Sequence, residues 1–270
     1  MPFTRVAVAG LPPLFIGAAR AVVAAALAAL ALACTRQRFP TPAQWRRLAV
    51  VGAGIVVGFP VLTSFALTTA PASHGAVVIA LLPAATATAA VLRTGERPGA
   101  GFWVAVALGS VVAVGFAALQ SGGLDSPQTA DLLLFGAVVA AAVGYAEGGL
   151  LARELGAWQT VSWALVASAP VMLALTGVTL RDGWPTASPT QWGAFAYLAA
   201  VSMFLGFFAW YRGLAIGPIA QVSQVQLVQP VLSITWAGLF LAERISLVTA
   251  LGGLAVIACA ATAVRARSAR

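Results

Sequence analysis

Two stretches of equal length decide the fold of this chain: PASHGAVVIALLP at residues 71–83 and PIAQVSQVQLVQP at residues 218–230. A shift of 147 positions places the opening and closing prolines of the first stretch on those of the second. The same shift, without a gap, places Glu96-Arg97 on Glu243-Arg244. Proline and glutamate are scarce in this chain, so the agreement indicates an internal duplication.

The composition places the duplicated units in a membrane. Of the 270 residues, 61% are apolar and 8% are charged, and the mean hydropathy is +0.95, which excludes an ordinary soluble globular protein. A helix that crosses the hydrocarbon core needs about 20 apolar residues. We therefore predict an all-α polytopic membrane protein with about nine visible transmembrane helices, at residues 12–34, 46–68, 72–92, 100–119, 132–152, 158–179, 192–211, 218–242 and 246–264.

The two copies are predicted to be inverted relative to each other. The second copy, residues 129–265, holds five predicted helices, and duplication of a unit with an odd number of helices reverses its orientation in the membrane. The first copy, residues 1–122, holds four, because the counterpart of helix 132–152 would lie before residue 1. The pattern is a 4+5 form of an inverted 5+5 repeat. It leaves two alternatives open: a start further upstream that restores the first helix, or a protein with nine spans.

The basic residues indicate one orientation in the membrane. All fifteen are arginine, and the formal net charge is +8. If the helices alternate in direction, one set of loops holds only Arg5, Arg181 and Arg244. Because basic loops stay cytoplasmic, we expect the other side, which includes the C-terminus, to be cytoplasmic. The loops on that side contain Arg36, Arg38, Arg46, Arg47, Arg93, Arg97, Arg153, Arg212, Arg265, Arg267 and Arg270.

Three ionisable residues lie within or at the ends of apolar segments, where each charge needs a reason. Arg20 is a candidate for binding an anionic group of a substrate; the alternative is an arginine that snorkels or closes a structural network. Glu147 is a candidate for proton coupling, because burial shifts a carboxyl group toward titration, or it forms an ion pair with Arg153 or Arg212. His74 is a second coupling candidate, or a polar residue at a helix end that faces headgroups. A single histidine predicts no metal site.

Four glutamines lie within residues 220–230, and the last two are nearest the middle of the membrane. Gln226 and Gln229 come just before Pro230, which leaves a backbone carbonyl unpaired, and irregular backbone at that depth is tolerated where it lines a cavity. We predict that both line a substrate pocket; the alternative is that they bridge helices. Tyr145, beside Glu147, and Trp210 are further candidates for substrate binding, while interface anchoring is the alternative for Trp210.

The duplication, the paired prolines and the "GER" and "AER" tails resemble the drug/metabolite transporter superfamily in its EamA-type branch. GLPPLFIGAARAVVAA (residues 10–25), GYAEGGLLAREL (144–155) and FLGFFAWYRGLAIGPIAQVSQVQLVQP (204–230) are similar to segments of that family, as is LAERIS (241–246). The resemblance implies an inner-membrane carrier, often an exporter of amino acids, metabolites or drugs, with a central pocket between the repeats. The chain departs from the pattern because the family's first helix is absent.

We therefore predict a secondary transporter that exports small organic metabolites, amino acids or drugs across the inner membrane by alternating access. The alternatives are a flippase for a lipid-linked substrate and a non-transporting subunit of a membrane assembly. An enzyme is not expected, because there is no second histidine and no Ser-His-Asp set. The expected partners are a small-molecule substrate, membrane lipid and a proton or counter-ion, and a homodimer is compatible with the sequence. No cofactor and no nucleic acid are expected.

Overall fold

The computed structural model describes residues 2–66, 78–121, 129–181 and 183–229, together with a few positions of the last forty residues. Within these ranges every regular element is a helix. In the first half of the chain the elements are α1 (Pro2–Val8), α2 (Pro13–Cys34), α3 (Pro42–Val51), η1 (Gly52–Gly58), α4 (Phe59–Ala66), α6 (Leu82–Thr94) and α7 (Ala100–Ser121).

The second half of the chain begins with α8 (Thr129–Leu155) and α9 (Ala157–Thr179). A third long helix follows, made of α10 (Pro189–Tyr197), η2 (Leu198–Leu205) and α11 (Gly206–Ile216). The described part of this half then continues with α12 (Ile219–Ser223) and η3 (Gln224–Leu227). The segments η1 and η2 are π-helical, and η3 is a 3₁₀ helix.

Five helices among the described residues are long and apolar enough to cross a membrane: Pro13–Cys34, Pro42–Thr63, Ala130–Leu155, Ala157–Thr179 and Pro189–Ile216. A shorter apolar helix covers Ala100–Val112. The prediction of an all-α polytopic membrane protein is confirmed. The predicted segments 72–92, 218–242 and 246–264 lie partly or largely outside the described residues.

Two of the predicted helices begin earlier than the apolar pattern suggested, and for the same reason. Thr41 and Ser188 each close a capping box: the hydroxyl accepts from the backbone N–H of Gln44 or Gln191, and that glutamine accepts from the cap's own N–H at 2.9 and 2.8 Å. A proline follows each cap at the first helical position, where its fixed φ suits the helix. The two boxes are 147 residues apart, which is the spacing of the sequence repeat.

The π-helical segments recur at nearly the same spacing, since η1 begins at residue 52 and η2 at residue 198. Each lies in the middle of a long helix that begins with one of the capping boxes. A π-helical segment inserts an extra residue into the α-helical ladder and is found mostly at functional sites. The two halves of the chain therefore share a local distortion as well as a sequence pattern.

The helices pack through small residues. Between the described helices the most extensive contact joins α2 to α9, and the buried face of α2 is rich in alanine, which lets two helices approach closely. The helix α8 packs against α3, η1, α4 and α6. Where it packs against η1, a Cβ added to Gly144 would lie 2.8 Å from the Ile55 Cγ2 atom. The alanines buried on α2 include Ala18, Ala21, Ala24, Ala25 and Ala28.

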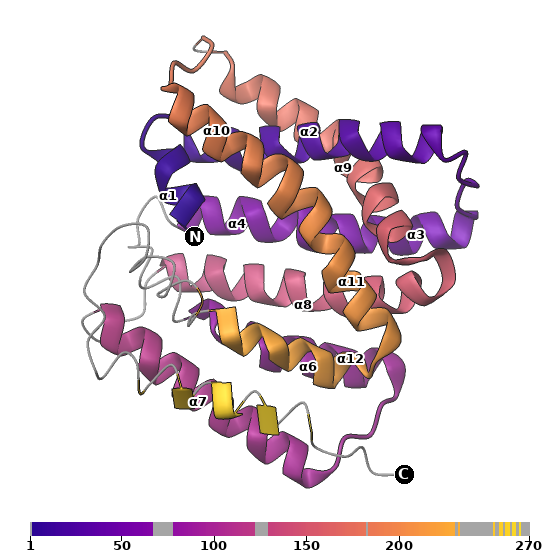
Figure 1. The fold of residues 1–270 in the computed structure, drawn as a ribbon, viewed down its shortest axis with the longest axis vertical. Helices are drawn as coiled ribbons and strands as arrows, with labels where there is room; N and C mark the ends of the chain where they lie inside the picture. Colours follow the sequence, from indigo (N-terminus) through magenta and orange to yellow (C-terminus); the bar gives the residue numbers. More distant parts are fainter. Residues whose placement is uncertain are drawn as a thin grey trace.

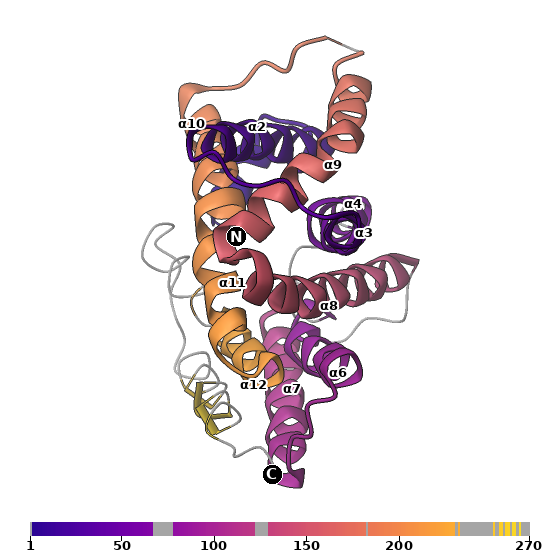
Figure 2. The same ribbon diagram turned by 90° about the vertical axis from the view of Figure 1, so that its right-hand side faces the viewer.

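The arrangement places α8 at the centre of the molecule. Figure 1 shows α2, α4, α8 and α6 one below another across the view. In Figure 2, turned by 90°, α2, α3–α4 and α6 are seen nearly end-on, and α7 lies at the edge of the molecule next to α6. Because α8 contacts helices of both halves, residues on its different faces reach different surroundings.

Candidate functional site

The segment that follows Pro218 is not one regular helix. The α-helix α12 ends at Ser223, and the next four residues form the 3₁₀ helix η3. A change from α to 3₁₀ geometry re-aims the side chains and often marks a functional hinge. The glutamines of this segment consequently have different surroundings.

Gln224 joins the two halves of the chain. Its side chain is fully buried, and its Nε2 donates to the backbone oxygen of Pro83 in α6 at 3.0 Å. The hydroxyl of Ser223 donates to the backbone oxygen of Ala220 at 2.8 Å and lies 3.4 Å from the same Pro83 oxygen. Gln224 therefore has the helix-bridging role that the sequence left open for the glutamines.

Gln226 faces a group of aromatic side chains. Its side chain lies near the hydroxyl of Tyr145 in α8. The ring of Tyr145 packs edge-on against Trp210 of α11, with centroids 5.5 Å apart and an interplanar angle of 69°. The structure thus brings together Tyr145, Trp210 and Gln226, three of the residues predicted to bind substrate. We call these three residues the polar-aromatic cluster.

Two polar atoms of the polar-aromatic cluster have no hydrogen-bond partner among the described residues. Trp210 Nε1 and Gln226 Oε1 are both buried and have no partner there. A buried polar atom without a partner costs free energy, so such atoms in a native structure point to a ligand or a functional requirement. One atom is a donor and the other an acceptor.

Tyr211 anchors one side of the polar-aromatic cluster. It is fully buried, and its hydroxyl donates to the backbone oxygen of Gly144 at 3.2 Å. A Cβ on Gly148 would lie 2.7 Å from the Tyr211 hydroxyl oxygen, so only glycine admits the ring there. The centroids of Tyr145 and Tyr211 are 6.3 Å apart. Because Gly148 has no side chain, α11 can pack closely against α8 beside Tyr145.

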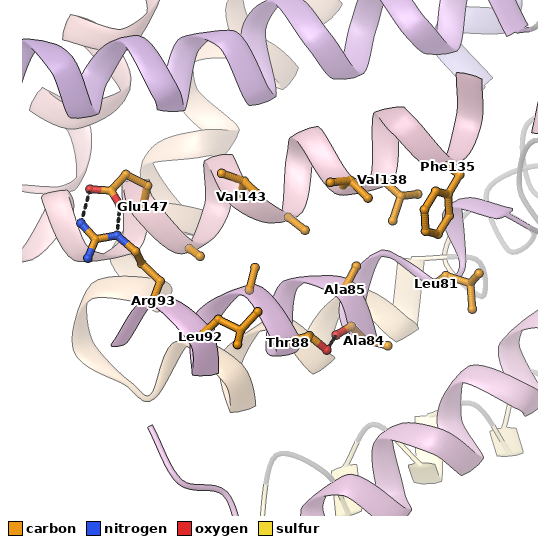
Figure 3. Close-up of a pocket in the computed structure, with 14 residues that line it drawn as sticks. Leu81, Ala84, Ala85, Thr88, Leu92, Arg93, Phe135, Val138, Val143 and Glu147 are labelled. Atoms are coloured by element: carbon orange, nitrogen blue, oxygen red, sulfur yellow. Dashed lines mark hydrogen bonds and ion pairs between the residues drawn. The ribbon is translucent and has the colours of Figure 1, made fainter. Parts of the chain in front are cut away.

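Glu147, two residues along α8 from Tyr145, lies in an ion-pair network. Arg93 Nε donates to Glu147 Oε2 at 2.5 Å, as Figure 3 shows, and Arg47 donates to Glu147 Oε1. Arg47 also donates to Glu154 at 2.5 Å. The Glu147 side chain is 7% exposed, whereas Arg47, Glu154 and Arg93 are 25%, 46% and 52% exposed. The network ties α3 and α6 of the first half to α8 of the second.

The predicted ion pair of Glu147 exists, but the predicted partners were wrong. Arg153 instead donates to the backbone oxygens of Ala215 and Gly217, at 3.2 and 2.8 Å. It therefore satisfies carbonyls at the end of α11, and Arg212 is exposed. Arg47 and Arg93 were missed because nothing in their spacing along the chain points to Glu147, which is 100 and 54 residues away.

A second carboxylate links the halves at the same end of the bundle. The two carboxylate oxygens of Glu96 accept from the backbone N–H groups of Ile219 and Ala220, at 3.0 and 3.2 Å. These N–H groups open α12 and have no partner within the helix. The glutamate of the repeated Glu-Arg pair thus caps a helix of the other half, a role that its spacing in the sequence does not reveal.

The remaining predicted site residues are not part of the polar-aromatic cluster. Arg20 lies within α2, and its Nε is buried without a hydrogen-bond partner in the described residues. Gln229 is exposed. His74 lies outside the described residues. Among the described residues, no group of three or more His, Cys, Asp or Glu side chains could hold a metal ion.

A polytopic helical bundle with distorted, related long helices and a polar cluster deep in the apolar interior has the architecture of secondary transporters. The chain belongs to the EamA-like transporter family, whose sequence pattern matches residues 1–117 and 128–265. It is 43% identical over 265 residues to the uncharacterized transporter YdeK of Bacillus subtilis (strain 168). The alignment covers 98% of this chain and 92% of that protein. The predicted resemblance is confirmed, and the chain is a multi-pass membrane protein of a transporter family.

A solved crystal structure shares this fold. It superposes with a TM-score of 0.78 at 20% sequence identity, over 94% of this chain and 87% of the other. At 20% identity the similarity shows only that the helices are arranged alike. It gives no information about the transported solute.

Proposed function

We propose that this chain exports a small organic solute, of the size of an amino acid, another metabolite or a drug, by alternating access. The observation that carries the proposal is the polar-aromatic cluster, in which Trp210 Nε1 and Gln226 Oε1 are buried without partners in the described structure. A transported solute with one acceptor and one donor would satisfy both atoms. Export as the direction, and the inner membrane as the location, follow the family resemblance.

The cluster favours a neutral or zwitterionic solute with an apolar or planar part. Tyr145 and Trp210 present ring faces and edges, and aromatic surfaces bind planar groups by stacking. Gln226 supplies a neutral carboxamide, which selects for hydrogen-bonding geometry instead of net charge. No metal or cofactor has a part in this proposal, and no enzymatic step is invoked.

The ion-pair network around Glu147 is consistent with movement of one half of the chain relative to the other. Alternating access requires contacts between the halves that can break on one side of the membrane. The pairs of Glu147 with Arg47 and Arg93 join the halves at one end of the bundle, and that end is the one we assign to the cytoplasm from the arginine bias. Glu147 is also the coupling candidate. If Glu147→Gln leaves the pH dependence of transport unchanged, protons are not coupled through this residue.

The test compares two glutamines of one segment. Purified protein is reconstituted in proteoliposomes loaded with a mixture of amino acids and aromatic metabolites, and efflux of each compound is measured by mass spectrometry. Gln226→Leu should weaken apparent affinity about tenfold or more, because a lost hydrogen bond in a desolvated site costs about 1–3 kcal/mol. The matched control is Gln229→Leu, since Gln229 is exposed.

Two results would contradict the proposal. One is wild-type protein that moves none of the compounds faster than empty liposomes, which would favour a lipid-linked substrate or a subunit of a membrane assembly. The other is equal efflux kinetics for wild type and Gln226→Leu, which would move the binding site away from the polar-aromatic cluster.

A further inference from the structure

A hollow lies on the flank of the molecule, between α6 and α8. Its volume is about 600 Å³. Alanines from both helices form its floor, and larger apolar side chains form its rims. Figure 3 shows it extending from Phe135 and Leu81 at one end to Arg93 and Glu147 at the other. We call it the α6–α8 groove.

The rims of the α6–α8 groove face outward. Leu92 is 82% exposed and Phe135 is 56% exposed, and Val139 and Val143 are also exposed. In a membrane protein, large apolar side chains exposed along a transmembrane helix face the hydrocarbon of the bilayer. The groove is therefore open to lipid.

Between its two ends the wall of the groove offers a polar solute no free donor. The proton of its hydroxyl group, on Thr88, is donated to the backbone oxygen of Ala84 at 2.9 Å, so only the hydroxyl oxygen could accept a further hydrogen bond. The other residues that line the groove between its two ends are apolar. A polar molecule that entered would lose several hydrogen bonds to water and regain at most one, whereas a hydrocarbon chain would lose none.

One end of the groove is charged, and the accessible charge is positive. Arg93 and Glu147 both line this end. The carboxylate is enclosed, with 7% of its side chain exposed, while 52% of the Arg93 side chain is exposed. A group arriving from the lipid therefore meets the guanidinium first, and the guanidinium attracts an anion.

The dimensions suit a lipid tail. Phe135 and Glu147 are twelve residues apart on α8, which corresponds to about 18 Å along a helix. The groove is thus an apolar channel about as long as half of a bilayer core, with a cation at the end that we assign to the cytoplasm. A phospholipid with its phosphate at that end would match both features.

We propose that the α6–α8 groove binds one acyl chain of an anionic phospholipid, with the headgroup phosphate at Arg93. Basic pockets between transmembrane helices recognise anionic headgroups in this manner. The site is separate from the polar-aromatic cluster, so the proposal does not depend on which solute is transported. It assigns a second ligand, a structural or modulatory lipid, to the protein.

Native mass spectrometry of the full chain in mild detergent tests the proposal. Phosphatidylglycerol and phosphatidylcholine with identical acyl chains are titrated separately. We expect one tightly held phosphatidylglycerol per chain, bound about fivefold more strongly than phosphatidylcholine. Both lipids carry a phosphate, but the choline ammonium offsets its charge in phosphatidylcholine, and a basic residue gains about 1 kcal/mol from a net anionic lipid. Equal binding of the two lipids would overturn the headgroup assignment.

Paired variants locate the site. Ala85→Phe fills the floor of the groove and should remove the tightly bound lipid, whereas Ala107→Phe makes the same change at an exposed position of α7 and should not. Arg93→Gln should abolish the preference for phosphatidylglycerol, whereas Arg97→Gln, at an exposed position just beyond α6, should keep it.

Unchanged lipid binding in a folded Ala85→Phe protein would place the lipid elsewhere and overturn the proposal. Displacement of the lipid by an exported solute would identify the groove as a solute path instead. Because Gln226→Leu leaves the groove intact, it should retain lipid binding whether or not the export proposal holds.

Discussion

Removal of the charge of Glu147 should destabilise the protein much more than removal of the charge of Glu154. Both carboxylates lie on α8, and both accept from Arg47. Glu147 has a second guanidinium partner in Arg93 and is nearly enclosed, whereas 46% of the Glu154 side chain is exposed. Glutamine has nearly the same shape as glutamate, so the substitutions change charge with little change in packing.

The magnitude follows from burial. Loss of one partner of a fully buried ion pair costs about 3–5 kcal/mol, because the other charge remains uncompensated. Arg47 and Arg93 are 25% and 52% exposed, and solvent screening reduces the expected cost of Glu147→Gln to about 2–3 kcal/mol. The cost of Glu154→Gln should be about 0–1 kcal/mol, as for an exposed pair.

Thermal unfolding in one detergent, followed by tryptophan fluorescence, measures the difference. For a protein near this size, 1 kcal/mol corresponds to about 2–4 °C. Glu147→Gln should therefore lower Tm by about 4–12 °C and Glu154→Gln by no more than about 4 °C. Equal shifts for the two variants, or an unchanged Tm for Glu147→Gln, would refute the argument that burial concentrates the stabilisation at Glu147.

Four further substitutions test the packing and capping of the helices. Gly144→Leu should cost about 1–3 kcal/mol or more by overpacking the contact with η1 and should reduce the monodisperse yield in size-exclusion chromatography; Gly177→Leu, where a Cβ has open space, should not. Glu96→Ala should cost about 0.5–2 kcal/mol, because α12 loses the acceptor of its first N–H groups, and a Tm equal to wild type would argue against the cap. Thr41→Ala and Ser188→Ala should each cost about 1 kcal/mol; a measurable loss of Tm in one but not the other would show that the two capping boxes do not contribute alike.

The sequence was sufficient for the main helices, whose positions depend on the local order of residues. Long apolar runs predict membrane helices because the bilayer core sets a minimum length, and α2, α8 and α9 lie where those runs were found. The recurring prolines and the Glu-Arg pairs predicted the duplication. The capping boxes at Thr41 and Ser188 were also readable from the sequence, as a Ser or Thr followed three residues later by Gln, but the apolar pattern alone placed both helix starts a few residues late.

Only the tertiary structure decided which polar residues meet. Tyr145, Trp210 and Gln226 could be selected one by one as polar or aromatic residues in apolar segments, but their contact depends on how α8, α11 and η3 are rotated about their axes. Small residues such as Gly144 and Gly148 set that rotation, because two helices approach most closely where a side chain is missing.

The same reason explains the assignments that the sequence missed. A side chain fully within a membrane bundle must find its partner among whatever the neighbouring helices present, and those neighbours are distant in the chain. Glu147 pairs with arginines 54 and 100 residues away, and Gln224 reaches Pro83 across 141 residues. The sequence by itself predicted an all-helical membrane protein and placed the long apolar helices of the described residues; the packing of small residues between those helices determined where the polar groups meet.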